Sequence, residues 1–129
     1  MIEPILYILV RTDLASLTPG KVAAQVSHAS TAFAIHNART KLLDQWANHG
    51  DTRRGFGTAI VLGVDDDVVI LEFCQEAIDK ALVAGVICDP SYPLRDGDYT
   101  HLIKLITCGY IFGDREVAGP LVAHLSLLK

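Results

Sequence analysis

A nearly continuous apolar run close to the N-terminus constrains the fold most. Residues Ile5 to Arg11 read I-L-Y-I-L-V-R, so six apolar or aromatic side chains precede the arginine. Successive side chains of a strand point to opposite faces of its sheet, and a strand that is apolar at every position therefore needs cover on both faces. This run predicts a central strand in a sheet that has helices packed on both sides.

The rest of the chain alternates between strand-like and helix-like segments. In chain order, the patterns predict a strand at Ile5–Arg11, helices at Pro19–His36 and Thr40–Asn48, a strand at Gly57–Val64, a helix from about Val68 to Ala84, strands at Val86–Cys88 and Thr100–Thr107, and a last helix at Asp114–Leu128. Pro120 should kink this last helix or divide it into two pieces. The order favours one α/β domain with a mixed sheet, in which ligands bind beyond the carboxyl ends of strands.

The helix predicted at Pro19–His36 carries two stripes of side chains. Apolar residues recur at the spacing of a buried face, at Val22, Val26, Ala29 and Phe33. Beside them, Lys21, Gln25 and His28 follow the spacing i, i+4, i+7 and fall within roughly 60° of one another on the helix. A solvent-exposed face would explain this edge. However, a lysine in the first turn opposes the helix dipole, and together with the free backbone N–H groups there it is better placed to bind an anion.

The second long helix and the segment after it are less regular. The helix from about Val68 is expected to bury Leu71, Cys74, Ile78 and Leu82 and to end at Gly85. The short strand that follows delivers Asp89 to an end of the sheet. Residues Pro90 to Asp98 contain two prolines and an Asp-Gly pair, which predict a stiff loop. An acid at the end of a strand can cap a turn, or it can take part in chemistry.

Length and composition limit the class of protein. A chain of 129 residues fits one domain, and its apolar runs are too short to span a bilayer. The three cysteines are odd in number and far apart, which argues against a disulfide framework and, with no visible secretory signal, indicates the cytoplasm. The histidines and cysteines form neither H-E-x-x-H nor C-x-x-C, so no zinc site is predicted. Hydrophobic residues make up 50% of the chain, a surplus that favours a homodimer.

Two segments resemble a known family. L-Y-I-L-V-R-T-D-L, followed by G-K-V-A-A-Q-V-S-H-A, is similar to the opening of the archaeal and eukaryotic type of peptidyl-tRNA hydrolase, and H-L-S-L-L at residues 124–128 is similar to its closing segment. The resemblance implies a four-stranded mixed β-sheet with helices on both faces, usually in a dimer. It also implies hydrolysis of the ester that joins a peptide to the 3′ end of tRNA, without a metal or an organic cofactor.

The resemblance also implies site residues. The family's catalytic lysine and aspartate fall on Lys21 and Asp89, its helix glutamine and histidine fall on Gln25 and His28, and a later threonine can be placed on Thr100 by deleting one residue from the preceding loop. In this assignment Asp89 activates water, Lys21 stabilises developing charge or a nearby phosphate, and His28 and Thr100 hold substrate or water by hydrogen bonds. After Asp89 the chain reads D-P-S-Y-P-L instead of the family's D-A-G-x-T-Q. Two alternatives therefore stay open: a catalytically idle module that binds RNA or protein, and a deacylase of other acyl-tRNAs.

The expected partner is tRNA that carries a peptidyl group, although the formal net charge is −4. Binding must then depend on a local cluster of cations, because the total charge does not report how Lys and Arg are distributed. We nominate Lys21, the adjacent pair Arg53 and Arg54, and Arg95 for this cluster. A solvated loop would equally explain the arginine pair.

Overall fold

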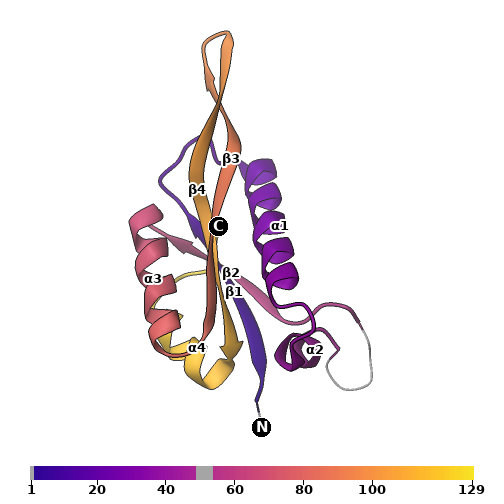
Figure 1. The fold of residues 1–129 in the computed structure, drawn as a ribbon. Helices are drawn as coiled ribbons and strands as arrows, with labels where there is room; N and C mark the ends of the chain where they lie inside the picture. The colour runs from indigo at the N-terminus through magenta and orange to yellow at the C-terminus, as the bar shows by residue number, and fades with distance from the viewer. Residues whose placement is uncertain (1, 49–53) are drawn as a thin grey trace.

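The computed structural model describes residues 2–48 and 54–129, which form a mixed sheet of four strands with helices on both faces (Figure 1). The elements are β1 (Pro4–Arg11), α1 (Pro19–His36), α2 (Lys41–Ala47), β2 (Ala59–Val64), α3 (Asp67–Asp79), β3 (Val83–Asp96), β4 (Tyr99–Asp114) and α4 (Arg115–Val122). The strand order is β2-β1-β4-β3. β1 and β2 are parallel, whereas β4 is antiparallel to both of its neighbours.

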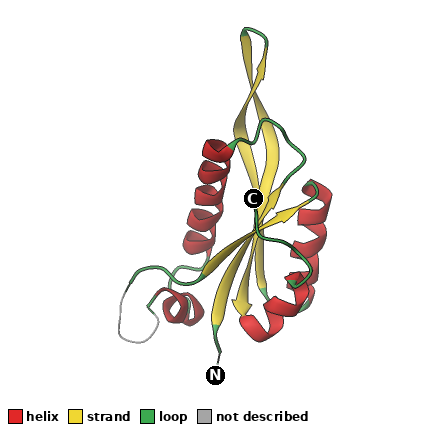
Figure 2. Ribbon diagram, turned by 180° about the vertical axis from the view of Figure 1, so that it is seen from behind, coloured by secondary structure: helices red, strands yellow, loops and turns green. Residues whose placement is uncertain are grey.

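Strand β1 is central, and its last seven residues are buried. Ile5, Tyr7 and Leu9 face the core under α3 and α4, whereas the alternate residues Leu6 and Ile8 face the core under α1 and α2. Figure 2 shows the two pairs of helices on opposite sides of the sheet. The predicted fold class and the predicted central strand are therefore confirmed.

The segment predicted as a stiff loop is part of a long hairpin. β3 runs through residues 90–96, β4 starts at Tyr99, and the two residues between them form a tight turn. Gly97 has φ of +58°, which suits a two-residue hairpin turn. The end of this hairpin projects beyond the helices as an arm (Figure 1). The prediction was wrong because prolines, which lack a backbone N–H, are typical of loops but are also tolerated in an edge strand. In the part of the chain that the structure describes, β3 is such an edge strand.

Helix α3 is shorter than predicted and buries a different face. It ends at Asp79, and Ala81, with φ of +60°, turns the chain into β3, so Gly85 lies in a strand. Its buried residues are Ile70, Cys74 and Ala77. Leu71 and Ile78 were expected in the core but are 45% and 53% exposed. Apolar side chains cover a wide arc of this helix, so the spacing of its residues did not identify which part of the arc is buried.

The C-terminal segment closes the free edge of β2. Helix α4 continues past Pro120 and ends at Val122, so the predicted helix to Leu128 is wrong. The chain after it is extended: Gly63 N donates to Ser126 O at 3.0 Å, and Leu128 N donates to Val61 O at 3.0 Å. These bonds occupy backbone groups on an edge that could otherwise pair with another chain.

Candidate active site

The polar edge of α1 faces β3 and β4. Gln25 is 3% exposed, Lys21 is half-buried, and His28 is exposed. Ala29 and Phe33 are buried in the core next to this edge, and their packing fixes the rotation of the helix about its axis. The predicted apolar stripe therefore turns the three polar side chains toward the sheet.

A chain of three side chains links α1 to both strands of the hairpin. Thr107 Oγ1 donates a hydrogen bond to Gln25 Oε1 at 2.6 Å, and Gln25 Nε2 donates to Asp89 Oδ2 at 2.7 Å. The backbone N–H of Ser91 donates to the other carboxylate oxygen of Asp89 at 2.9 Å. The hydrogen bond from Gln25, and then that from Ser91, lower the pKa of Asp89 below its usual value, and the charge of His28 acts in the same direction. Asp89 is thus held as an oriented carboxylate.

Two irregularities in the β3–β4 pairing direct the side chains of this network toward α1. Ile87 pairs with Cys108 and Cys88 pairs with Ile106, so Thr107 is an extra residue without a partner. A second shift follows directly after Asp89. Such bulges bend a strand and re-aim its side chains. They bring Thr107 and Asp89 to the same α1 residue.

Arg11 supports the first bulge from β1. This arginine is 7% exposed, and its Nη1 donates to the carbonyl oxygen of Ile106 at 2.9 Å. Its other nitrogens form two hydrogen bonds with the carboxylate of Asp13, at 2.7 and 2.8 Å. A bidentate pair of this kind fixes the guanidinium plane. The V-R-T-D sequence at the end of β1 therefore helps to hold the strand that carries Thr107.

Lys21 lies on the hairpin side of the network. Its Nζ donates to the carbonyl oxygen of Pro93 at 2.9 Å and lies 5.1 Å from the ring centroid of Tyr92. Tyr92 is fully buried, and its hydroxyl lies 2.9 Å from Ser16 Oγ. Tyr92 and Pro93, which follow Asp89 in the chain, thus provide a packed support for the lysine.

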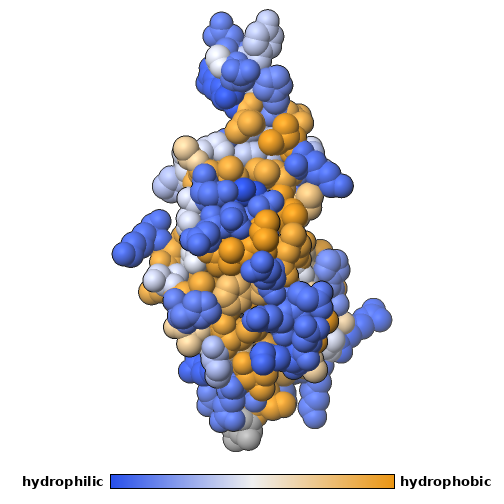
Figure 3. All heavy atoms as spheres, turned by 90° about the vertical axis from the view of Figure 1, so that its left-hand side faces the viewer, coloured by the Kyte–Doolittle hydropathy of each residue, from blue (hydrophilic) through white to orange (hydrophobic). Residues whose placement is uncertain are grey.

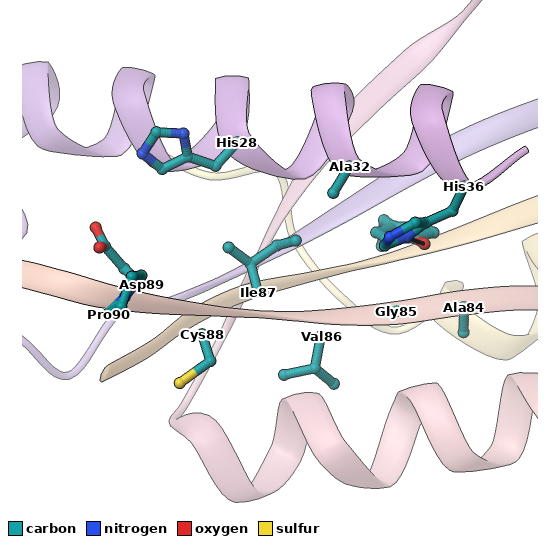
Figure 4. A pocket seen from close by; sticks show the side chains of 11 residues that line it. His28, Ala32, His36, Ala84, Gly85, Val86, Ile87, Cys88, Asp89 and Pro90 are labelled. Carbon is teal, nitrogen blue, oxygen red and sulfur yellow. Dashed lines mark hydrogen bonds between the residues drawn. The ribbon is translucent and has the colours of Figure 1, made fainter. Parts of the chain in front are cut away.

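A pocket opens next to Asp89, between α1 and β3. Its volume is about 730 Å³, and Figure 4 shows His28 from α1 and Asp89 from β3 facing each other at one end. His36 Nδ1, further along the helix, is 3.4 Å from Tyr110 Oη. Ile87 also points into the pocket, whereas Val86 and Cys88 point to the other face of β3 (Figure 4). The carboxylate therefore lies at the edge of a cavity that can admit a ligand.

The structure brings together four of the residues predicted for the site: Lys21, Gln25, His28 and Asp89. It does not bring Thr100 to them. Thr100 is exposed and pairs with Arg95 near the end of the arm, whereas Asp89 pairs with Leu105. Thr107 occupies the position beside Gln25, and the sequence interpretation missed it. A buried glutamine needs partners for both its oxygen and its nitrogen, and this requirement could have prompted a search for a hydroxyl in the neighbouring strand.

Two of the predicted arginines, Arg54 and Arg95, lie on different parts of the structure. Arg95 is exposed on the arm, where Nε donates to Gly97 O at 3.3 Å. Arg54 is exposed, with its guanidinium carbon 5.7 Å from the ring centroid of Phe56, and it lines a separate hollow beside the start of β1. Arg53 lies outside the described residues. Neither Arg54 nor Arg95 contacts the Thr107–Gln25–Asp89 network.

The described residues contain neither a candidate metal cluster nor a candidate membrane-spanning helix. Within residues 2–48 and 54–129, no three His, Cys, Asp or Glu side chains gather in a way that could hold a metal ion. No helix in this part of the chain is long and apolar enough to cross a membrane. All three cysteines are free thiols.

Comparison with known proteins identifies the family. The family model described as Peptidyl-tRNA hydrolase PTH2 matches residues 5–127. A curated protein from Sulfolobus acidocaldarius, named peptidyl-tRNA hydrolase, is 32% identical over 130 aligned positions, which cover 94% of this chain and 97% of the relative. A solved structure of a protein of unknown function from Agrobacterium tumefaciens shares the fold, with a TM-score of 0.61, 9% identity and full coverage of both chains. The extent of the first two matches shows that this chain belongs to the peptidyl-tRNA hydrolase PTH2 family.

Proposed function

We propose that this protein hydrolyses the ester bond between a peptidyl group, or an N-blocked aminoacyl group, and the 3′ end of tRNA. The observation that carries the proposal is the carboxylate of Asp89, which two hydrogen bonds orient at the edge of a pocket. Membership of the PTH2 family supports this choice of reaction. Ester hydrolysis needs an oriented water, an acceptor for its proton and a group that stabilises the developing oxyanion.

In this proposal Asp89 orients the attacking water. Each of its oxygens accepts one hydrogen bond from the protein, and each has a lone pair left for a water molecule. The lowered pKa keeps Asp89 ionised at neutral pH but also makes it a weak base. Its main contribution is therefore to position the water and to stabilise positive charge as the water loses its proton. An aminoacyl ester is reactive enough for a weak base to be sufficient.

Lys21 supplies the positive charge. Its Nζ is held by one carbonyl oxygen and by the face of one tyrosine, and a flexible side chain can leave these contacts for an anionic partner. A phosphate of the tRNA end and the oxyanion of the reacting ester are two such partners. Lys21 thus contributes both to binding and to the transition state.

Gln25 and Thr107 are positioning residues. The Thr107 hydroxyl donates to the amide oxygen of Gln25, and the amide nitrogen is thereby directed at Asp89. His28 faces Asp89 across the opening of the pocket (Figure 4) and holds substrate or water by hydrogen bonding. We therefore assign to Thr107 the role of orienting Gln25 and, through it, Asp89.

The test is turnover of N-acetylated aminoacyl-tRNA by the purified protein. We expect release of the N-acetyl amino acid, and much slower release of an amino acid whose amine is free. Binding of the tRNA without any turnover would support the idle-module alternative. Equal turnover of free and blocked aminoacyl-tRNA would instead indicate a broader deacylase.

We propose that tRNA binds through Lys21 and Arg95 on the arm side, with Arg54 as a contact for a more distant phosphate. Each phosphate contact releases counterions, so the affinity for tRNA should fall steeply as the salt concentration rises. Fluorescence titrations at about 50 and 200 mM salt would measure the slope. An affinity independent of salt would contradict a phosphate-based interface.

We propose a homodimer that uses the outer face of α3. Val68, Leu71 and Ile78 are exposed on this helix, and Figure 3 shows hydrophobic residues reaching the surface between hydrophilic ones on that side of the molecule. Closed two-fold dimers are the commonest assembly, and burying these side chains would stabilise one. Light scattering at micromolar concentration should give twice the chain mass of 14.0 kDa. A mass of one chain would exclude the dimer.

The proposed substrate also suggests the compartment. Peptidyl-tRNA arises during translation, and the three free thiols suit reducing conditions. We therefore propose a cytoplasmic location, which cell fractionation would test by comparison with a ribosomal marker.

A further inference from the structure

The side of α1 that carries Lys21, Gln25 and His28 continues toward the end of the helix. Ala32 and His36 lie four and eight residues after His28, on the same side of the helix. They face β3, where Asp89, Ile87 and Gly85 follow one another on the side turned toward α1. The pocket between these two rows of residues extends along α1 for about 12 Å from His28, at 1.5 Å per helical residue. It thus leads away from Lys21.

The walls of the pocket are mainly apolar. Ala32 and Ile87 form its middle (Figure 4). A Cβ atom on Gly85 would lie 2.5 Å from the ring of Tyr110, so the glycine lets this ring lie against the strand at the far end. The volume of about 730 Å³ falls within the range of about 300–1,000 Å³ usual for small-molecule sites. The pocket is large enough for any amino-acid side chain.

The charges around the pocket indicate which part of the substrate enters it. Among the described residues, no lysine or arginine lines the pocket, and Asp89 places a negative charge at its entrance. A phosphate is therefore disfavoured there. Lys21, the one lysine or arginine of α1, precedes His28 by about 10 Å along the helix and contacts the hairpin at Pro93. The nucleotide side of the ester is expected toward Lys21, and the acyl side must then point the other way.

From this geometry we propose that the pocket holds the side chain of the C-terminal amino acid of the peptidyl group. This inference rests on the proposed function and adds the direction in which the substrate lies. The reacting carbonyl sits beside Asp89, the side chain lies over Ala32 and Ile87, and the tRNA end lies toward Lys21. The imidazole of His36 and the hydroxyl of Tyr110 offer hydrogen-bonding groups to larger side chains at the far end.

The test is to narrow the middle of the pocket by Ala32→Phe. One tRNA is charged either with N-acetylglycine or with N-acetylphenylalanine, and kcat/KM is measured for both. The wild-type protein should accept both substrates. The variant should lose about tenfold or more on N-acetylphenylalanine, because a filled pocket excludes the ring, while N-acetylglycine stays within about twofold. Ser27→Phe, which adds the same ring on an exposed side of α1 turned away from the pocket, should change neither value.

Other outcomes are equally informative. An equal loss on both substrates would show that the pocket holds a part common to both, such as the terminal adenosine, and would overturn the proposal. Unchanged values on both would also overturn it. Thermal unfolding shows whether the Ala32→Phe variant is folded. If it is unfolded, the smaller substitution Ala32→Leu takes its place, and we expect a weaker loss on N-acetylphenylalanine. Absence of turnover by the wild-type protein on either substrate would refute the proposed function itself and this inference with it.

Discussion

Replacing Thr107 by valine tests the site network directly. Valine keeps the branched shape that suits a strand, but it removes the hydroxyl that donates to Gln25 Oε1 at 2.6 Å. Thr107 is fully buried and Gln25 is 3% exposed, so water cannot easily replace the missing donor. A buried acceptor left unsatisfied costs about 1–3 kcal/mol, and at about 3–5 °C per kcal/mol for a chain of this length Tm should fall by about 3–15 °C.

The activity of this variant separates a role at the site from a purely structural one. Without the hydroxyl, the Gln25 amide is no longer held toward Asp89, and turnover should fall about tenfold or more because small misplacements slow catalysis strongly. Since the hydrogen bond from Gln25 is the largest cause of the lowered pKa of Asp89, the acid limb of the pH–rate profile should also move to higher pH. A substitution that only loosened the fold would not move this limb.

Thr100→Val is the matched control, because the same change falls on an exposed arm residue. Its stability should stay within about 0.5 kcal/mol of wild type, and its turnover within about twofold. The assignment of Thr107 would be refuted if Thr100→Val abolished turnover while Thr107→Val kept both the rate and the pH profile of the wild type.

Three further outcomes are expected. Asp89→Asn should reduce turnover by roughly 10²-fold or more and leave tRNA binding intact, as measured by single-turnover kinetics and titration; wild-type turnover would make Asp89 a structural cap. Lys21→Ala should weaken binding and slow turnover together, and a change in only one of them would limit the lysine to that step. Because the folded-state pKa of Asp89 is lowered, its carboxylate adds stability above the unfolded pKa of about 3.9, and this stability disappears as pH falls through the lower folded value. The difference in the free energy of unfolding between wild type and Asp89→Asn should therefore shrink as the pH is lowered. A difference that does not change with pH would contradict a lowered pKa of Asp89 in the folded state.

Features determined by local sequence could be predicted. β1 was recognisable because only a strand covered on both faces tolerates such a continuous apolar run. α1 matched its predicted bounds, Pro19 to His36, because its apolar stripe keeps one helical spacing from Val22 to Phe33. The polar edge of α1 followed from the same periodicity.

Features determined by pairing over long distances could not be predicted. The arm depends on the register in which β3 pairs with β4. Without this pairing, Pro90 and Pro93 are more typical of a loop than of a strand. The buried face of α3 was ambiguous because Ile70 and Leu71 are adjacent and equally apolar, and only the contact with the sheet decides that Ile70 is buried.

The position of Thr107 shows why the site was only partly recognisable. In the sequence it ends a predicted strand and has no distinguishing neighbour. Its role arises because the pairing of Ile87 with Cys108 and of Cys88 with Ile106 leaves it as the extra residue of a bulge. The carbonyl of Ile106, which precedes it, is held by Arg11. The same bulge directs the hydroxyl at Gln25, and Gln25 in turn is directed at Asp89. The orientation of one carboxylate therefore depends on side chains from α1, β3 and β4, with Arg11 of β1 behind them. A sequence motif within a single segment cannot reveal all of these residues.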